Sequence, residues 1–156
     1  MAKHFQRTIN FLSTSTGDLS AADILLELLE LPAVYVDGPT QRGTTTYAEA
    51  IIPDFLFDAA LKDVRLFIQT NHRLPKDVII GSQTLSLEDF AATLADHIVS
   101  PGSIRVKHGR SDFENYFPKD AQKSFDWPIH PEGFAPNELL ELARLQGWTL
   151  KPARLR

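Results

Sequence analysis

The segment 126–133 holds the densest group of side chains that could do chemistry. It contains two carboxylates, Asp126 and Glu132, one imidazole, His130, and one indole, Trp127. A hydrolase could use His130 as a general base beside the carboxylates, and a metal site could use the same three groups as ligands. The alternative is that the segment has only a structural role: its two prolines stiffen a loop, and its tryptophan packs against the rest of the domain. No motif places these candidate catalytic residues on a common face.

Gly38 and Gly43 frame a loop whose spacing alone matches a phosphate-binding loop. Such a loop needs a lysine directly after its second glycine and a helix that begins there. Here Thr44 follows, and the next residues favour a strand. The sequence therefore predicts a hairpin loop whose tip carries Arg42, a cation that could contact an anionic partner.

Other signals for metals and nucleophiles are missing from the sequence. The chain has no cysteine, which excludes disulfides, thiolate metal sites and cysteine nucleophiles. No two of its histidines are four residues apart, and it has no Gly-x-Ser-x-Gly motif. We expect His97 to pack at the edge of a helix and His72 to lie at a helix C-terminus. We therefore predict no metal site and no cofactor.

Composition and charge narrow the class of protein. The chain has 156 residues, 43% of them hydrophobic, which favours one folded domain over residues 1–156. Its net charge of −4 does not predict nucleic-acid binding, and the basic stretch 105–110 is interpreted as a solvated edge. The sequence has no apolar run long enough for a membrane helix and no secretory signal at residues 1–5. A full-length chain would therefore be cytoplasmic, whereas for an excised domain the location stays open.

Four helices are expected from capping residues and from the spacing of apolar residues. Ser20 with Asp23, and Ser86 with Asp89, each combine a capping side chain with a carboxylate that favours a helix N-terminus. The expected bounds are Ser20 to Pro32, Pro53 to Asn71, Ser86 to Pro101 and Pro136 to Gln146. Gly147 is expected to end the last helix in a left-handed conformation.

The apolar stripes of the second and third helices indicate a shared core. The second stripe comprises Phe57, Ala60, Leu61, Val64, Phe67 and Ile68. Phe90 lies on the apolar face of the third helix, and a short hairpin joins the two helices. We therefore expect Phe67 and Phe90 to belong to one hydrophobic core.

Short strands fill the segments between these helices. Residues 33–36 are rich in β-formers and lead into a turn at Asp37 and Gly38, so residues 44–51 are predicted to return as their partner. Residues 78–80 and 84–85 predict a tight hairpin in which Gly81 has a positive φ. In residues 103–107, apolar and polar side chains alternate weakly, as in a short strand. The expected fold class is α+β, with about four helices packed with small antiparallel β-hairpins and a helix–hairpin–helix unit at 53–100.

The span 59–99 resembles the pseudomurein-binding repeat, a small helix–hairpin–helix module. The matched positions are Ile68, Asn71, Leu74, Pro75, Val78, Gly81, Leu85, Ser86, Phe90 and Ile98. In that family the module, usually in several copies, attaches proteins to a cell-wall polymer, so the resemblance implies a polymer ligand. One copy is visible here. Most of the matched positions are those that a helix end, a turn, a cap and apolar packing require.

The leading functional hypothesis is a non-catalytic binding or interaction module for a polymer or protein partner. Its expected contact residues are Tyr116, Trp127 and Phe134, from a loop rich in aromatic residues, together with Arg42. One alternative is a hydrolase or small-molecule enzyme built on Asp126, His130 and Glu132. Another is a structural subunit of a larger assembly, and self-association stays open. No membrane or nucleic-acid partner is expected.

Overall fold

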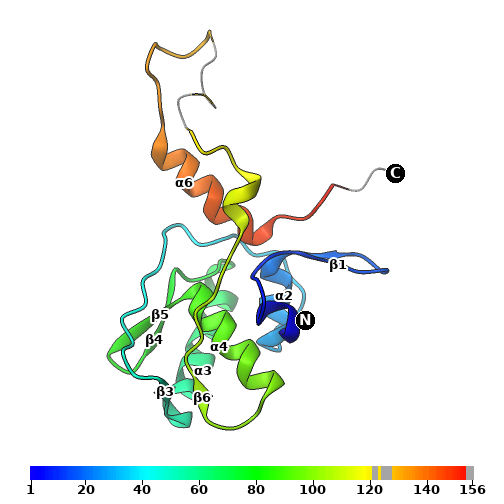
Figure 1. Cartoon of the computed structure of the whole chain (residues 1–156), viewed down its shortest axis with the longest axis vertical. Coiled ribbons are helices and arrows are strands. Elements are labelled where there is room, and N and C mark those ends of the chain that lie inside the picture. The colour runs from blue at the N-terminus through cyan, green and yellow to red at the C-terminus, as the bar shows by residue number, and fades with distance from the viewer. Residues whose placement is uncertain (121–122, 124–127, 154–156) are drawn as a thin grey trace.

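The computed structural model describes residues 1–120, 123 and 128–153 and has the mixed α+β architecture that the sequence predicts (Figure 1). The helices are α1 (Ala2–Phe5), α2 (Ala21–Leu28), α3 (Asp54–Asn71), α4 (Leu87–Val99) and α6 (Asn137–Leu145), with 3-10 turns η1 (Phe113–Tyr116) and η2 (Gln146–Thr149). The strands are β1 (Leu12–Ser13), β2 (Asp18–Leu19), β3 (Ile51–Ile52), β4 (Asp77–Ile80), β5 (Gln83–Ser86) and β6 (Ile104–Arg105). They form antiparallel pairs: β1 with β2, β3 with β6, and β4 with β5.

Side-chain caps begin α2 and α4, as predicted. The Ser20 hydroxyl accepts a bond from the Asp23 amide at 3.1 Å, and the Asp23 carboxylate accepts one from the Ser20 amide at 2.8 Å. At α4, the Ser86 hydroxyl accepts a bond from the Asp89 amide at 3.2 Å. These bonds satisfy amides that have no partner within the helix, and this fixes where each helix begins.

The helix–hairpin–helix unit that the sequence predicts is present as α3, the β4–β5 hairpin and α4. The rings of Phe57 on α3 and Phe90 on α4 are 5.9 Å apart in the hydrophobic core. His97 packs edge-on against Phe57, with ring centroids 6.0 Å apart, so its predicted edge position is confirmed. Apolar side chains from both helices and the hairpin thus form one buried cluster.

The expected place of Phe67 in this core is wrong. Phe90 is fully buried, but 39% of the Phe67 surface is exposed. The buried positions of α3 are 57, 60, 64 and 68, which form a narrow stripe at helical spacing. Because successive residues are about 100° apart around a helix, a residue next to Ile68 is turned to the flank of α3.

The hairpin prediction is confirmed. Ile80 pairs with Gln83, which leaves Gly81 and Ser82 as the two-residue turn. The φ angle of Gly81 is 64°, in the left-handed region that glycine adopts without a steric penalty. The turn therefore fixes the register of β4 against β5.

Two other expectations need correction. Residues 33–36 form no strand, and residues 44–51 do not return along them. Instead the amides of Thr46 and Tyr47 donate to the Thr84 carbonyl of β5, at 2.9 and 3.0 Å, because that strand edge offers outward-facing backbone groups. Gly147 is not left-handed: it lies within η2, where an added Cβ would clash with the ring of Phe113.

Figure 1 shows α6 raised above the body formed by α2, α3, α4 and the hairpins. The turn η2 joins α6 to this body through Trp148, which is buried against Phe113 with ring centroids 5.6 Å apart. Within the described ranges, no helix combines the length and the apolar character needed to cross a membrane.

Alanine substitutions at Phe90 and Phe67 test whether the two side chains differ in burial. We expect Phe90→Ala to lower the free energy of unfolding by about 3–5 kcal/mol, since it leaves a cavity in the core. Phe67→Ala should cost roughly 1 kcal/mol or less, because much of that ring already faces water. Urea denaturation of both variants measures the difference, and equal losses would contradict the placement of Phe67 on the flank.

Candidate functional site

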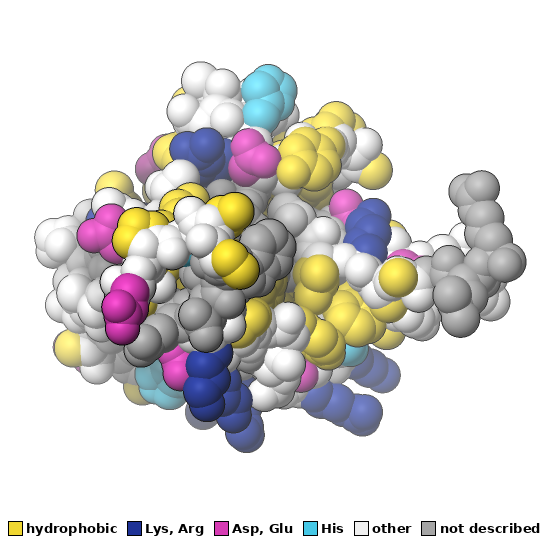
Figure 2. Space-filling model, turned by 90° about the horizontal axis from the view of Figure 1, so that it is seen from above, with side chains coloured by type: hydrophobic (Ala, Val, Ile, Leu, Met, Phe, Trp, Pro, Cys, Tyr) yellow, Lys and Arg dark blue, Asp and Glu magenta, His cyan; other side chains and the backbone are white. Residues whose placement is uncertain are grey.

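A groove lies between the loop 38–43 and the helix α6. It has a volume of about 430 Å³ and is lined by Thr40, Gln41, Arg42, Asn137, Glu138, Glu141, Leu142 and Leu145. Leucine side chains make its surface mainly apolar, while charged and amide groups surround them. Figure 2, which looks down from above, shows hydrophobic, acidic and basic side chains next to one another, with Lys and Arg side chains gathered along one border.

The loop that carries Arg42 is tied to the end of α6. The Gly38 amide donates to Gln146 Oε1 at 2.9 Å, and Gln146 Nε2 donates to the Pro39 carbonyl at 3.3 Å. Arg42 Nε donates to Glu141 Oε1 at 3.0 Å. Both walls of the groove are therefore joined by hydrogen bonds and one ion pair, and Arg42 stands between them with 58% of its side chain exposed.

The continuation of the loop is anchored to the N-terminus of α4 by the buried carboxylate of Asp89. Thr45 Oγ1 donates to Asp89 Oδ2 at 2.5 Å and accepts a bond from the Ser86 amide at 2.8 Å. Asp89 Oδ1 accepts a bond from the Gly109 amide at 2.8 Å. A Cβ at Gly109 would clash with the backbone oxygen of Glu88, so this close approach requires glycine.

A narrow polar pocket adjoins the groove at Arg42. Its volume is about 20 Å³, enough for a water-sized molecule, and its lining includes Arg42, Glu88, Ser111, Phe113, Arg144 and Trp148. Glu88 comes from the first turn of α4, Arg144 from α6 and Trp148 from η2. The pocket is therefore formed by contacts of α6 and η2 with the N-terminus of α4.

Burial raises the pKa of the Glu88 carboxyl above its ordinary value of 4.5, because desolvation penalises its charged form. A hydrogen bond from its own backbone amide, the positive charge of Arg42 and a hydrogen bond from Trp148 act in the opposite sense without cancelling this effect. Indole has only a donor, so the Trp148 N–H donates to Glu88. The pocket thus shifts this carboxyl towards its neutral form, although an arginine faces it.

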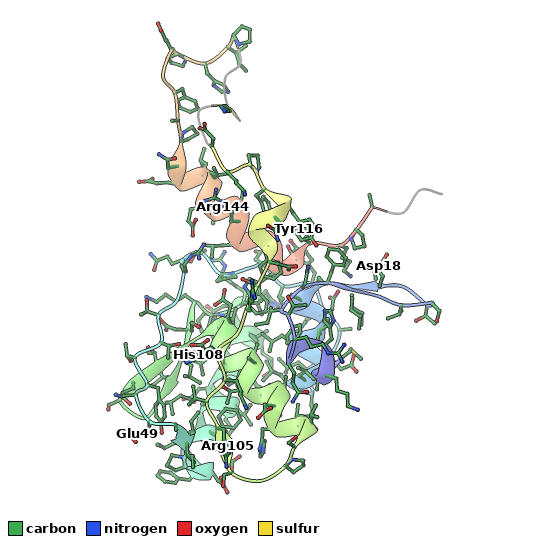
Figure 3. The ribbon with its side chains drawn as sticks, viewed as in Figure 1. Asp18, Glu49, Arg105, His108, Tyr116 and Arg144 are labelled. Atoms are coloured by element: carbon green, nitrogen blue, oxygen red, sulfur yellow. The ribbon has the colours of Figure 1, made fainter. Side chains whose placement is uncertain are left out.

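Arg144 forms the other basic side of the pocket. Its Nη2 donates to the backbone carbonyls of Pro118 and Lys119 at 3.0 and 3.4 Å, and its Nη1 is 3.7 Å from Glu141 Oε2. Its Nε is buried and has no hydrogen-bond partner in the described part of the chain. Figure 3 shows Arg144 on α6 close to η1, which carries Tyr116.

Of the contact residues predicted from sequence, Arg42 lies in this site. Tyr116 is exposed, but its hydroxyl accepts a bond from Asn10 Nδ2 at 3.0 Å and its ring is 5.6 Å from that of Phe11. Phe134 is exposed and stacks on His130, with ring centroids 4.8 Å apart. These three residues therefore belong to different local packings.

The other candidates are placed only in part. Asp126 and Trp127 lie outside the described residues, so the proposed grouping of Asp126, His130 and Glu132 stays a prediction. Glu132 is exposed at the surface. Among the residues that the structure describes, no three His, Cys, Asp or Glu side chains are grouped as a metal ion would require.

Sequence reasoning missed Glu88, Ser111, Arg144 and Trp148. Glu88 lies between the capping Ser86 and Asp89, so the sequence indicates only an acidic residue in the first turn of a helix. Trp148 follows Gly147, which in the sequence indicates the end of a helix, whereas in the structure Gly147 packs closely against Phe113. The one available signal is a tryptophan directly after an amphipathic helix, which indicates that the helix end packs on a body.

No family model, no curated protein and no solved structure matches this chain. The local resemblance of residues 59–99 to the pseudomurein-binding repeat therefore stays a prediction.

The raised pKa of Glu88 predicts a specific dependence of stability on pH. The folded state binds this proton more tightly than the unfolded state does, so its stabilising contribution is present below about pH 4.5 and is lost as pH rises through the folded pKa. Glu88→Gln keeps the shape and the acceptor for Trp148 without ionising. We expect the wild type to lose stability relative to this variant as the pH rises above about 4.5.

Urea denaturation at several pH values measures that difference. Asp23, whose pKa is lowered because bonds from Lys151 and Ser20 outweigh desolvation, loses its contribution as pH falls, but it does so in both proteins and cancels. A difference that is constant with pH, or that changes in the opposite sense, would contradict the assignment.

Proposed function

We propose that this chain is a non-catalytic binding module for a protein partner, and that an acidic, extended segment of the partner lies in the groove between the loop 38–43 and α6. The observation that carries the proposal is the position of Arg42. It stands where a mainly apolar groove meets a narrow polar pocket, with more than half of its side chain exposed.

The charges around Arg42 favour an anionic group. Two guanidinium groups, those of Arg42 and Arg144, flank the carboxylate of Glu141 at 3.0 and 3.7 Å. Burial raises the pKa of Glu88, so at a given pH this carboxyl carries less negative charge than an exposed glutamate would. At the end of the groove next to the polar pocket, two guanidinium groups thus flank the carboxylate of Glu141, while Glu138 lies further along α6 in the same lining. A carboxylate of a partner can form charge-assisted hydrogen bonds to a guanidinium group.

The floor of the groove favours an apolar side chain next to that acidic group. Leu142 is 39% exposed and lies in the groove with Leu145, so a partner side chain would remove apolar surface from water. The volume of about 430 Å³ is in the range of known ligand-binding pockets. An uncharged polysaccharide could not form a charge-assisted hydrogen bond with Arg42, whereas an acidic protein segment could, so we favour a protein segment over a polymer.

The loop is held in place before any partner binds. Gln146 bonds to Gly38 and Pro39 at one end, and Thr45 bonds to Asp89 at the other. A preformed loop loses little conformational entropy on binding, which lowers the cost of association. The groove is thus built on fixed elements of the fold.

A library of random peptides displayed on phage, selected on the wild-type protein, tests the proposal. We expect the recovered peptides to contain Asp or Glu next to an apolar residue. Synthetic copies should bind Arg42→Gln about ten-fold more weakly, which corresponds to about 1.4 kcal/mol. Isothermal titration calorimetry measures both affinities, and the melting temperature of the variant shows whether its fold is retained.

Arg105→Gln is the matched control, because Arg105 is exposed on β6 at the opposite end of the molecule from Arg144 (Figure 3). It removes the same charge and should leave the affinity unchanged. Recovered peptides without acidic residues, or equal losses in the two variants, would overturn the proposal. Selective retention of the protein on an uncharged polysaccharide would favour the polymer ligand instead.

A further inference from the structure

The β4–β5 hairpin has two outer edges, and only one of them is covered. On the β5 side, the Thr84 carbonyl accepts bonds from the amides of Thr46 and Tyr47, and the Thr84 amide donates to Thr46 Oγ1 at 2.9 Å. The Ser86 amide donates to Thr45 Oγ1 at 2.8 Å. The segment 44–47 therefore satisfies the outer backbone groups of β5.

The register shows which groups of β4 face outward. In an antiparallel pair, the residues of alternate pairs bond to each other, and the residues of the other pairs direct their backbone groups away from the hairpin. Thr84 and Ser86 are outward-facing, and they pair with Ile79 and Asp77. The N–H and C=O groups of Ile79 and Asp77 therefore face outward on β4, and they have no hydrogen-bond partner within the described ranges.

An apolar groove runs beside this open edge, between β4 and the flank of α3. It has a volume of about 110 Å³ and is lined by Asp63, Val64, Phe67, Pro75, Asp77, Val78 and Ile79. Phe67 has 39% of its surface exposed, and Ile79 has 62%. An unpaired strand edge next to exposed apolar side chains is the geometry that accepts an added strand.

The charges at this groove are mainly acidic. Asp63 has no hydrogen-bond or ion-pair partner in the described part of the chain, and Asp77 is paired only loosely with Lys76, at 3.8 Å. A strand with lysine or arginine side chains would place cations beside these carboxylates, whereas an acidic strand would be repelled.

From this we propose that the outer edge of β4 is a docking site for an extended segment of a protein partner in which basic and apolar residues alternate. The segment adds as a third strand: its backbone pairs with Asp77 and Ile79, and its apolar side chains all lie on the face of Phe67. Its basic side chains alternate with them and lie on the opposite face, which Asp77 and Ile79 share. These basic side chains lie beside the Asp77 carboxylate, and Asp63 on α3 adds negative charge to the same groove. This site is independent of the groove at Arg42, which we propose takes an acidic segment.

A second copy of this chain fits the edge less well. Pairing β4 with another β4 would bring Asp63 and Asp77 of both copies together, and the chain already carries a net charge of −4. Like charges at an interface oppose association. The acidic flank thus favours a basic segment from another protein.

The test uses synthetic peptides of alternating lysine and valine with blocked ends, titrated into the ¹⁵N-labelled protein. We expect shifts of the amide signals of Asp77 and Ile79 and slower hydrogen exchange at these amides. A glutamate–valine peptide should bind more weakly by about ten-fold or more, and a lysine–valine peptide with N-methylated backbone should not bind. The double variant Asp63→Asn, Asp77→Asn should weaken binding by about three-fold or more.

The matched control is the double variant Asp54→Asn, Asp58→Asn, which removes two exposed carboxylates of α3 that do not line the groove. It should bind the lysine–valine peptide like the wild type, and so should Arg42→Gln, which separates this test from that of the Arg42 groove. Binding that survives N-methylation, or shifts that map elsewhere, would overturn the proposal. Concentration-dependent shifts of Ile79 without peptide would assign the edge to a second copy.

Discussion

The buried carboxylate of Asp89 is the contact on which the arrangement of this molecule most depends. It lies in the first turn of α4 and binds the Thr45 hydroxyl and the Gly109 amide, while its own amide is capped by Ser86. A carboxylate removed from water is costly unless its oxygens accept hydrogen bonds, and these donors come from segments far apart in the sequence. Asp89 thus holds together the loop before α3, the start of α4 and the segment after β6.

Because of these bonds, one loop forms part of the groove at Arg42 and also covers an edge of the hairpin. In the segment 38–47, Gly38 bonds to Gln146 at the end of α6, and Arg42 lines the polar pocket. Further along the segment, Thr45 bonds to Asp89 and Thr46 bonds to the outer edge of β5. Because that edge is covered and the edge of β4 is not, the hairpin is left with one side open. The two proposed docking sites are consequences of the path of a single irregular segment.

Features set by neighbouring residues could be predicted from the sequence, whereas features set by distant ones could not. The caps at Ser20 and Ser86 and the turn at Gly81 were predicted because each depends on a few adjacent residues. The placement of Phe67 failed because apolar character does not show which flank of a helix is covered. Of the candidate site, Arg42 was predicted as a loop-tip cation, but Glu88 and Trp148 meet only through tertiary packing, and their local sequences carry no sign of it.

The sequence separation of the contacts has a consequence for how the chain folds. The helix–hairpin–helix unit closes through nearby residues, whereas Gly38 and Gln146 are 108 positions apart and Asn10 and Tyr116 are 106 apart. Closing long loops costs more entropy and slows the steps that need them. We therefore expect the unit at 53–100 to form early and the groove beside Arg42 to be assembled last, when the C-terminal elements dock. A ribosome would have to release nearly the whole chain before that groove exists.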